Sequence, residues 1–310
     1  MLKENYKKGI FFGIFEITLV GLEPIIANSR PDVLDPYFFA ATTCLVQAFL
    51  FLPLMLIERK KIKSSIEVNS TKPDENTNLL NGWKNNKLLF IYIGFNFGIA
   101  QILFFIGYSL AGAINGSITQ KSIIIFALLF GFLINKEKIS KTQVIFSFVL
   151  LFGLILAVTQ GSFNLLEFNM GVLILIVMAI LWMIAHALTK PIFDKKESTS
   201  IFVVFLRSTI SGAALISTYF IFYPIENLQL LFNSENQLFI LIMGCVYGFA
   251  LFFWYKVLGY LGTSKGTAVT SPTPIITALF ATIILGEVFT IFHLIGSAIV
   301  ILSIIIIVKK

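Results

Sequence analysis

Two carboxylates, Glu16 and Glu23, lie seven residues apart within an apolar segment near the N-terminus. At that spacing they share one face of a helix and are separated by about 10 Å along its axis. An ionisable side chain near the centre of a bilayer costs about 2.5–3.5 kcal/mol even on the lenient insertion scale. Glu16 is therefore tolerable if it faces water, pairs with a cation or carries a proton. If Glu16 faces water or pairs with a cation, it is a candidate substrate contact or supports one. If it carries a proton, it is a candidate proton carrier. For Glu23 the alternative is contact with the outer membrane interface.

Two cations also lie within apolar segments, and each has an alternative location at the membrane surface. Lys121 either neutralises Glu23 or extends its flexible stem to the surface, and Arg207 has the same second option. Trp182 and His186 are one helical turn apart, as are Tyr92 and Asn96, so each pair shares a helix face. The candidate substrate-binding or coupling residues are Glu16, Glu23, Lys121, Asn96, Tyr92, Trp182, His186 and Arg207.

Other kinds of chemistry find little support in the residues. The chain has only two histidines and two cysteines, and Cys44 and Cys245 both lie inside apolar segments, so we expect no metal site and no disulfide. The glycine-rich stretch at 262–267 lacks the residue order of a phosphate-binding loop. We therefore expect no cofactor and no catalytic residues.

The elements that position the candidate residues are membrane-spanning helices. Hydrophobic residues make up 57% of the 310 residues and charged residues 13%, whereas soluble domains carry about 25% charged residues. A spanning helix needs roughly 20 apolar residues. Ten such runs occur, at 10–27, 36–57, 88–110, 114–134, 142–159, 170–190, 200–222, 237–257, 267–286 and 290–308. The sequence predicts an all-α integral membrane protein with ten transmembrane helices.

The net charge of +7 is explained by topology rather than by a nucleic-acid partner. With both termini in the cytoplasm, all of the 23 lysines and arginines except Arg30, Lys121 and Arg207 fall in cytoplasmic segments. This asymmetry is the positive-inside rule. The polar segment 58–87 contributes many of these charges and is predicted to be a solvated, partly disordered cytoplasmic loop.

An internal repeat organises the ten helices. Shifted by 150 residues, 88–158 aligns with 238–308 without a gap and pairs Gly94 with Gly244 and Gly98 with Gly248. We therefore predict two five-helix repeats, 1–159 and 160–310. Because five is odd, the second repeat enters the membrane with the opposite orientation, a plan that recurs in secondary transporters. The glycines, at the spacing of a close helix contact, are expected to pack helices 3 and 8 around the axis of the repeat.

The paired acidic residues Glu137 and Glu287 interrupt apolar sequence, and we assign them to hairpins between helices rather than to substrate binding. Thr290 is placed to cap the helix that follows Glu287. In the first repeat, Ser140-x-x-Gln143 has the form of a capping box. Glu137 is expected on the cytoplasmic side and Glu287 on the outer side.

Three stretches are typical of one transporter group: "SPTPIITALFATIILGE" (271–287), with Pro274 thirteen residues before Glu287, "LDPYFFA" at 34–40, and "AILWMIAHALTKP" in the sixth helix. On these residues the chain resembles the drug/metabolite transporter superfamily, in particular its ten-helix EamA-type members. It implies a monomeric or homodimeric basket of helices around a central cavity, with the fifth and tenth helices outside. Ile124 stands where the first repeat of the family has proline, Asn135-Lys136 replace Leu-Gly, and Thr43 replaces an arginine.

The resulting hypothesis is a secondary active transporter of the cytoplasmic membrane that works by alternating access as an exporter or exchanger. Carboxylates, cations and aromatic groups together favour an amino acid or another small polar compound that carries an amine. The alternatives are an intramembrane lipid-modifying enzyme and a carrier of lipids or nucleotide sugars with the same fold. The absence of an Asp/His/Ser cluster from the loops argues against the enzyme.

Overall fold

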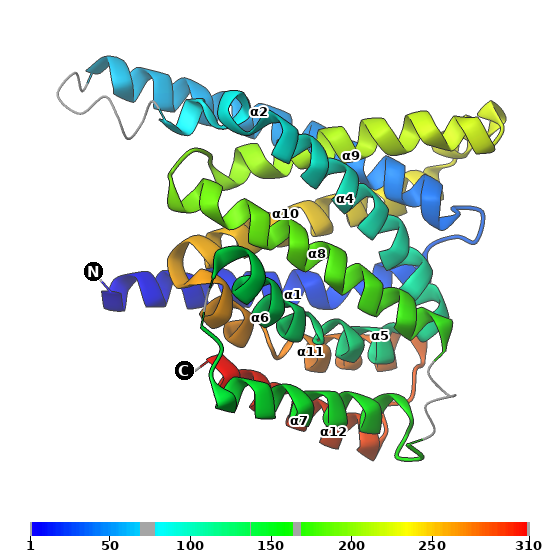
Figure 1. Cartoon of the computed structure of the whole chain (residues 1–310). Helices are drawn as coiled ribbons and strands as arrows, with labels where there is room; N and C mark the ends of the chain where they lie inside the picture. Colours follow the sequence, from blue (N-terminus) through cyan, green and yellow to red (C-terminus); the bar gives the residue numbers. More distant parts are fainter. Residues whose placement is uncertain (1, 69–77, 137, 164–168, 309–310) are drawn as a thin grey trace. The chain divides into compact units, whose positions relative to one another are not determined.

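The computed structural model describes residues 2–68, 78–136, 138–163 and 169–308, and the regular structure of these residues is entirely helical (Figure 1). The helices are α1 (Leu2–Ser29), α2 (Pro36–Val68), α4 (Gly82–Ala111), α5 (Ala113–Gln120), α6 (Ile123–Asn135), α7 (Lys141–Val158), α8 (Met170–Asp194), α9 (Ser200–Phe222), η2 (Ile225–Phe232), α10 (Ser234–Val269), α11 (Thr273–Phe280), η3 (Ala281–Leu285) and α12 (Ile291–Val308).

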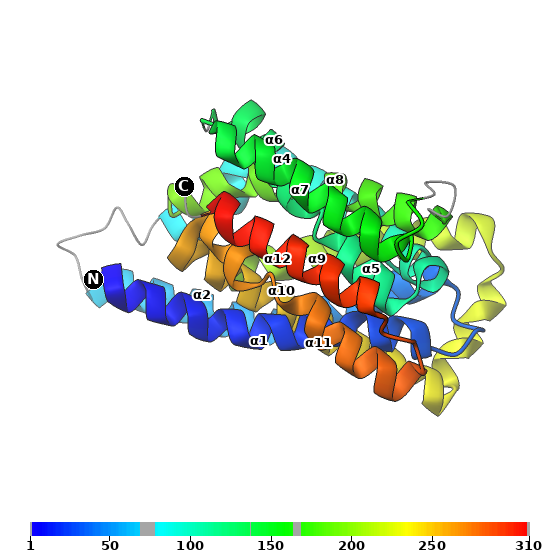
Figure 2. The same cartoon turned by 90° about the horizontal axis from the view of Figure 1, so that it is seen from below.

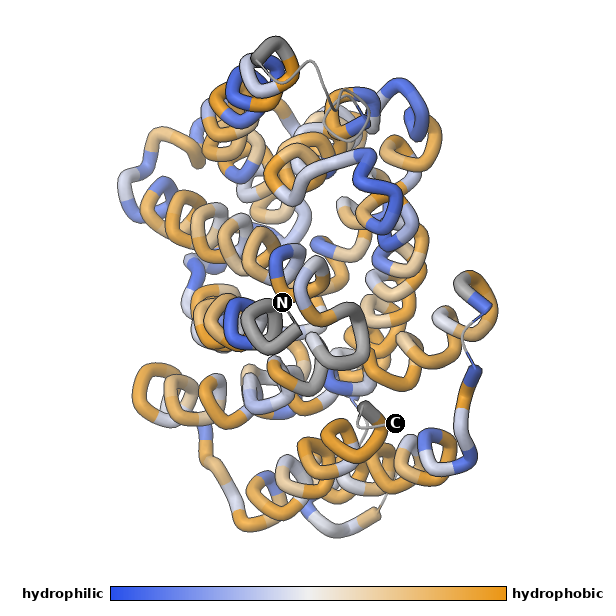
Figure 3. The backbone as a smooth tube through the Cα atoms, turned by 90° about the vertical axis from the view of Figure 1, so that its left-hand side faces the viewer, coloured by the Kyte–Doolittle hydropathy of each residue, from blue (hydrophilic) through white to orange (hydrophobic). Residues whose placement is uncertain are grey.

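Within the described ranges, eight helical segments are long and apolar enough to cross a membrane, and Thr273–Leu285 and Ile291–Ile307 are shorter apolar helices. Hydrophobic residues run along the helices, and many hydrophilic residues lie in the connections between them (Figure 3). The chain is therefore a multi-pass helical membrane protein. Eight of the ten predicted runs correspond to helical segments of spanning length, and the last two do not reach that length, so the full count of ten spans is not confirmed.

One predicted run is interrupted and one predicted boundary is wrong, and both differences fall at breaks in helices. The run 114–134 is two helices, because the chain turns at Lys121 and Ser122, whose N–H groups bond to carbonyls three residues back. The run predicted to start at 267 begins later, since α10 continues to Val269 and the chain turns at 270–272 before α11. With the 150-residue offset, these two breaks occupy equivalent positions.

The predicted loop 58–87 is mostly helical where the structure describes it. Helix α2 continues to Val68 and α4 begins at Gly82, while 69–77 lie outside the described residues. The charged residues after position 58 are good helix formers, so the helix extends beyond the apolar run. The guanidinium of Arg59 also lies over the Phe202 ring, 5.2 Å from its centroid, which ties this extension to α9.

The chain forms two compact units, which we call unit 1 and unit 2. Unit 1 contains residues 1–30, 103–183 and 249–310, and unit 2 contains 31–102 and 184–248. Each unit takes segments from both halves of the sequence, so the units do not coincide with the predicted repeats. The repeat boundary at 159/160 stays a prediction, and each unit is described separately below.

In unit 2, the paired glycines bring helices close together, as the sequence predicts, but their contacts are with α2 and α9. Gly94 of α4 faces Ile210 of α9, and Gly244 of α10 faces Val46 of α2. A Cβ on Gly244 would lie 2.5 Å from Cγ1 of Val46, closer than van der Waals contact allows. Each glycine-bearing helix thus packs against a helix from the other half of the chain.

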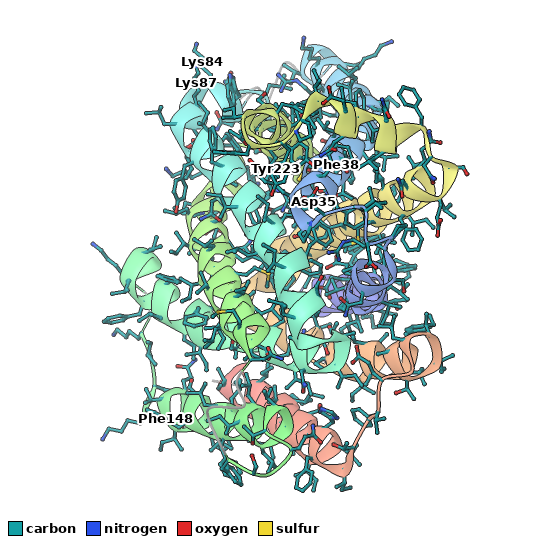
Figure 4. The ribbon with its side chains drawn as sticks, turned by 90° about the vertical axis from the view of Figure 1, so that its right-hand side faces the viewer. Asp35, Phe38, Lys84, Lys87, Phe148 and Tyr223 are labelled. Carbon is teal, nitrogen blue, oxygen red and sulfur yellow. The ribbon has the colours of Figure 1, made fainter. Side chains whose placement is uncertain are left out.

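The first turn of α2 also lies in unit 2 and is fixed by a partly buried polar cluster. The Asp35 carboxylate accepts hydrogen bonds from the N–H groups of Tyr37 and Phe38 at 2.9 and 3.0 Å, and from the Tyr219 hydroxyl at 2.9 Å. Figure 4 shows Asp35 and Phe38 at this end of α2 with Tyr223 nearby. The "LDPYFFA" stretch therefore begins α2 with an acidic N-cap.

In unit 1, α1 runs alongside the end of α10 and the start of α11. A Cβ on Gly13 would contact Val269, and one on Gly21 would contact Ile276. Helices α7 and α12 lie side by side (Figures 1 and 2). They approach closely at Gly153 and Gly296, where a Cβ on Gly296 would lie 2.5 Å from the Gly153 carbonyl oxygen.

Replacing Gly94 or Gly244 with alanine tests these close contacts. Each new Cβ would press against a β-branched side chain of the facing helix, so we expect a loss of about 1–3 kcal/mol in the free energy of unfolding. Thermal unfolding of the purified protein in detergent measures the change. Gly259→Ala is the matched control, because nothing lies within 4 Å of its added Cβ. Equal melting temperatures for all three variants would contradict the packing described here.

Candidate functional site

Glu16 and Glu23 are both buried in α1, with 7% and 3% of their surfaces exposed. Gly13 and Gly21, which bracket Glu16, face Val269 and Ile276. The two helical segments therefore run parallel, and Glu16 lies at the level of the break at 270–272. This burial agrees with the expectation that Glu16 contacts other groups of the protein, and it places Glu23 inside the protein as well; its position relative to the membrane interface stays a prediction.

Lys121 lies at the other helix break of unit 1, where α5 ends. It is 7% exposed, and its ammonium donates a hydrogen bond of 3.0 Å to the carbonyl oxygen of Thr270. This carbonyl lies at the end of α10, the negative end of the helix dipole. Lys121 is also close enough to Glu16 and Glu23 for their charges to interact. The ammonium therefore lies inside the protein, and the surface location considered from the sequence is wrong.

Unit 1 thus gathers an acid-rich cluster, which we define as Glu16, Glu23 and Lys121 with the Thr270 carbonyl. If all three side chains are ionised, their net charge is −1. Among the described residues, the buried atom Oε2 of Glu16 and the hydroxyl of Thr277 have no hydrogen-bond partner. Within the cluster, Oε2 of Glu16 is therefore an acceptor that the described residues leave unused.

Trp182 also belongs to unit 1, and it is half-buried. Its ring stacks on Phe104 of α4 with centroids 6.3 Å apart. This contact places Trp182 in an aromatic group between α4 and α8. His186, one turn further along α8, belongs to unit 2, where its ring meets Phe97 at a centroid distance of 5.2 Å.

Arg207 is the most deeply buried of the candidate cations. Only 1% of its surface is exposed, so the surface location considered for it is wrong. Its Nη2 donates to Oε1 of Gln47 at 3.1 Å, and its guanidinium lies over the ring of Phe97, 4.3 Å from the centroid. Tyr247 lies near it at 5.7 Å. Side chains of α2, α4 and α10 therefore surround this charge.

Tyr92 and Asn96 share a face of α4, as predicted, but their environments differ. Asn96 is 6% exposed, whereas Tyr92 is 43% exposed. The Asn96 amide donates to the Tyr92 hydroxyl at 3.3 Å, and the buried oxygen of Asn96 has no hydrogen-bond partner within the described ranges. Asn96 thus has the stronger claim to a polar interior role.

Glu287 lies in the connection between η3 and α12, as the sequence predicts, and it has a contact that the sequence did not reveal. Its two carboxylate oxygens accept hydrogen bonds from the N–H groups of Ala113 and Ile114 at 2.6 and 2.9 Å. These are orphan donors in the first turn of α5, whose N-cap, Gly112, has a φ of 80° and no side chain to cap them. Glu287 therefore caps α5, and its negative charge interacts favourably with the positive end of the α5 helix dipole.

The remaining hairpin assignments have mixed outcomes. Glu137 lies outside the described residues. Pro274 is buried near the start of α11. The first N–H groups of a helix have no partner within it, so proline, which lacks this N–H, is tolerated there. It therefore marks the beginning of a helix rather than the hairpin itself.

Both predicted helix caps are confirmed. Ser140 and Gln143 form a reciprocal capping box at the start of α7. At the equivalent position in the second half, the Thr290 N–H donates to Nδ1 of His293 at 3.1 Å, and the His293 N–H donates to the Thr290 hydroxyl at 3.4 Å. Histidine thus takes the place of the usual Glu or Gln.

Comparisons with known proteins agree with this helical organisation. The sequence matches the EamA-like transporter family over residues 7–159 and again over 169–309. A protein of Methanothermobacter thermautotrophicus named as an uncharacterised transporter is 25% identical over 201 residues, covering 62% of this chain. The match covers 56% of that relative, so the chain spans just over half of its length.

A solved crystal structure of a protein has a similar fold. The match has a TM-score of 0.65 at 14% sequence identity and covers 97% of this chain and 96% of the other. At this level of identity, the similarity concerns the fold alone.

Replacing Glu287 with glutamine tests its role as the cap of α5. Glutamine has one neutral acceptor where glutamate has two charged ones, so we expect a loss of about 1–2 kcal/mol in the free energy of unfolding. Thermal unfolding measures it, with Glu226→Gln as a control at an exposed glutamate in η2. If both variants melt like the parent, the two hydrogen bonds to α5 contribute nothing to stability.

Proposed function

The chain belongs to the EamA-like transporter family, and we propose that it is a secondary active transporter for a small polar organic compound that carries an amine. It works by alternating access, as an exporter or exchanger in the cytoplasmic membrane. The observation that carries this proposal is the acid-rich cluster of unit 1, where one buried ammonium at a helix break interacts with the charges of two buried carboxylates.

The charges of this cluster support the proposal that it binds two cations in turn, a proton and the ammonium group of the substrate. An ionised carboxylate in an apolar bundle is costly unless a cation or a proton neutralises it. Oε2 of Glu16 is a buried acceptor without a partner in the described part of the chain. A proton on Glu16 and the ammonium group of a substrate are two ways to supply the same positive charge. Their alternate binding would couple transport of the amine to proton movement in the opposite direction.

The helix breaks support a transport role in a second way. Broken helices in secondary transporters expose backbone carbonyls and helix ends to a substrate or ion near the middle of the membrane. Here the breaks at 121–122 and 270–272 are equivalent under the 150-residue offset, and the Lys121 ammonium binds the Thr270 carbonyl. We propose that the two halves are inverted repeats and that these breaks lie at the centre of their motion.

Uptake by proteoliposomes provides the direct test. The purified protein is reconstituted and offered a panel of radiolabelled amines, amino acids and neutral metabolites, with an imposed pH gradient of either sign. We expect at least one amine-bearing compound to accumulate more in protein-containing vesicles than in empty ones, driven by one sign of the gradient. Transport of no amine-bearing compound under either gradient would contradict the proposal.

The variant Glu16→Gln tests the proposed coupling residue. It keeps the side-chain shape and removes a buried charge, so we expect the protein to fold while amine uptake falls at least about tenfold and loses its dependence on the pH gradient. Glu235→Gln, at an exposed residue in the first turn of α10, is the control.

Parent-like uptake by Glu16→Gln from mildly acidic to mildly basic pH would contradict a coupling role for this residue. Glu16 would then serve only packing or pairing, and Glu23 with Lys121 would become the coupling candidates. The melting temperature of the purified variant distinguishes lost transport from lost folding.

A further inference from the structure

Unit 2 contains a buried cation whose hydrogen-bonding groups are largely unused. In the part of the chain that the structure describes, Nε and Nη1 of Arg207 are buried and have no hydrogen-bond partner. Among the residues that the structure describes, no carboxylate forms an ion pair with this guanidinium. A buried charge without a counter-ion is strongly unfavourable, so this arrangement needs an acceptor from elsewhere.

Gln47 adds a third unused donor beside the guanidinium. Its Oε1 accepts hydrogen bonds from Nη2 of Arg207 and from the Ser208 hydroxyl, each at 3.1 Å. Because both partners are donors, the amide is held with its oxygen toward them, and neither partner uses its Nε2. That Nε2 is buried and also has no partner among the described residues. Gln47 itself is fully buried.

The surroundings of these donors restrict what kind of ligand they accept. The guanidinium lies over the Phe97 ring and near the Tyr247 ring. Its Nε and Nη1 are the N–H groups that remain without a partner among the described residues. The planar fork of a guanidinium matches the two oxygens of a carboxylate. One positive charge is neutralised by one negative charge, whereas a doubly charged phosphate would leave an excess charge among aromatic side chains.

We propose that Arg207 and Gln47 form a binding site for a singly charged carboxylate group. The assignment of that carboxylate to the transported compound rests on the proposed function, but the binding does not. The site by itself therefore predicts a ligand of this protein that carries a carboxylate.

Thermal unfolding of the purified full-length protein tests the binding without any transport. The probes are sodium acetate, lactate, benzoate and alanine, each compared with sodium chloride at the same ionic strength, and alaninamide serves as the analogue without a carboxylate. We expect at least one carboxylate in excess to raise the melting temperature of the parent by about 2–4 °C, because a ligand of the folded state stabilises it. Chloride and alaninamide should not.

Two substitutions locate the site. Gln47→Glu supplies an internal carboxylate beside Arg207, so it should keep the fold and abolish the carboxylate-dependent shift. Arg207→Met removes the cation and should also abolish the shift. Arg59→Met is the matched control, because Arg59 also lies over a phenylalanine ring, that of Phe202, but is only half-buried and donates to the Leu80 carbonyl. It should keep the full shift.

Three outcomes would overturn the proposal: no shift by any carboxylate in the parent, an equal shift by chloride, or a full shift retained in a folded Gln47→Glu protein. Failure of this inference is distinguishable from failure of the proposed function. Uptake of an amine without any carboxylate shift would remove only the carboxylate site. A shift that Gln47→Glu abolishes, in a protein that transports no amine, would leave the site in place and remove only the transporter mechanism.

Discussion

Burying charge in an apolar helical bundle is the constraint on which the rest of this structure depends. Glu16, Glu23, Lys121 and Arg207 are each less than one-tenth exposed, in a chain with few charged residues of any kind. Such groups are retained only where partners or ligands offset their loss of hydration. The two units differ in the sign of the buried groups that lack a partner among the described residues: unit 1 has one acceptor, Oε2 of Glu16, and unit 2 has the donors of Arg207 and Gln47.

Backbone groups are subject to the same constraint wherever a helix breaks inside the membrane. The structure satisfies several of them with side chains from distant parts of the sequence. Lys121 binds the carbonyl at the end of α10, and Glu287 binds two N–H groups at the start of α5. Both contacts join segments from the two halves of the chain within unit 1. Lys121 and Glu287 thus stabilise the helix ends at these breaks.

The sequence predicted the helical class, most spans and the two helix caps, because these depend on local patterns. Apolar runs of spanning length, and a Ser or Thr three residues before Gln143 or His293, require no knowledge of distant partners. The repeat even relates details of the backbone: Lys136 and Gly286, 150 residues apart, both end a helix in the left-handed conformation, with φ of 56° and 69°.

The sequence predictions were wrong where the structure depends on a contact or a helix break that hydropathy does not indicate. The break at Lys121 lies inside an apolar run, and the helix beyond position 58 is polar but still helix-forming. The burial of Arg207 could not be separated from a surface location, since its partner Gln47 is 160 residues away in the sequence. The contact of Glu287 with α5 was equally hidden, although Gly112 before an uncapped helix was a usable signal.

The most direct test of the central claim is a count of the protons released when the transported amine binds. The purified protein in weakly buffered detergent solution is titrated with the compound found by the uptake screen, and the change in pH is recorded. If the acid-rich cluster exchanges one cation for another, the parent releases close to one proton per bound amine under mildly acidic conditions, and Glu16→Gln releases none. Equal proton release by the parent and by Glu16→Gln, with binding intact in both, would contradict the claim that this cluster couples the two cations.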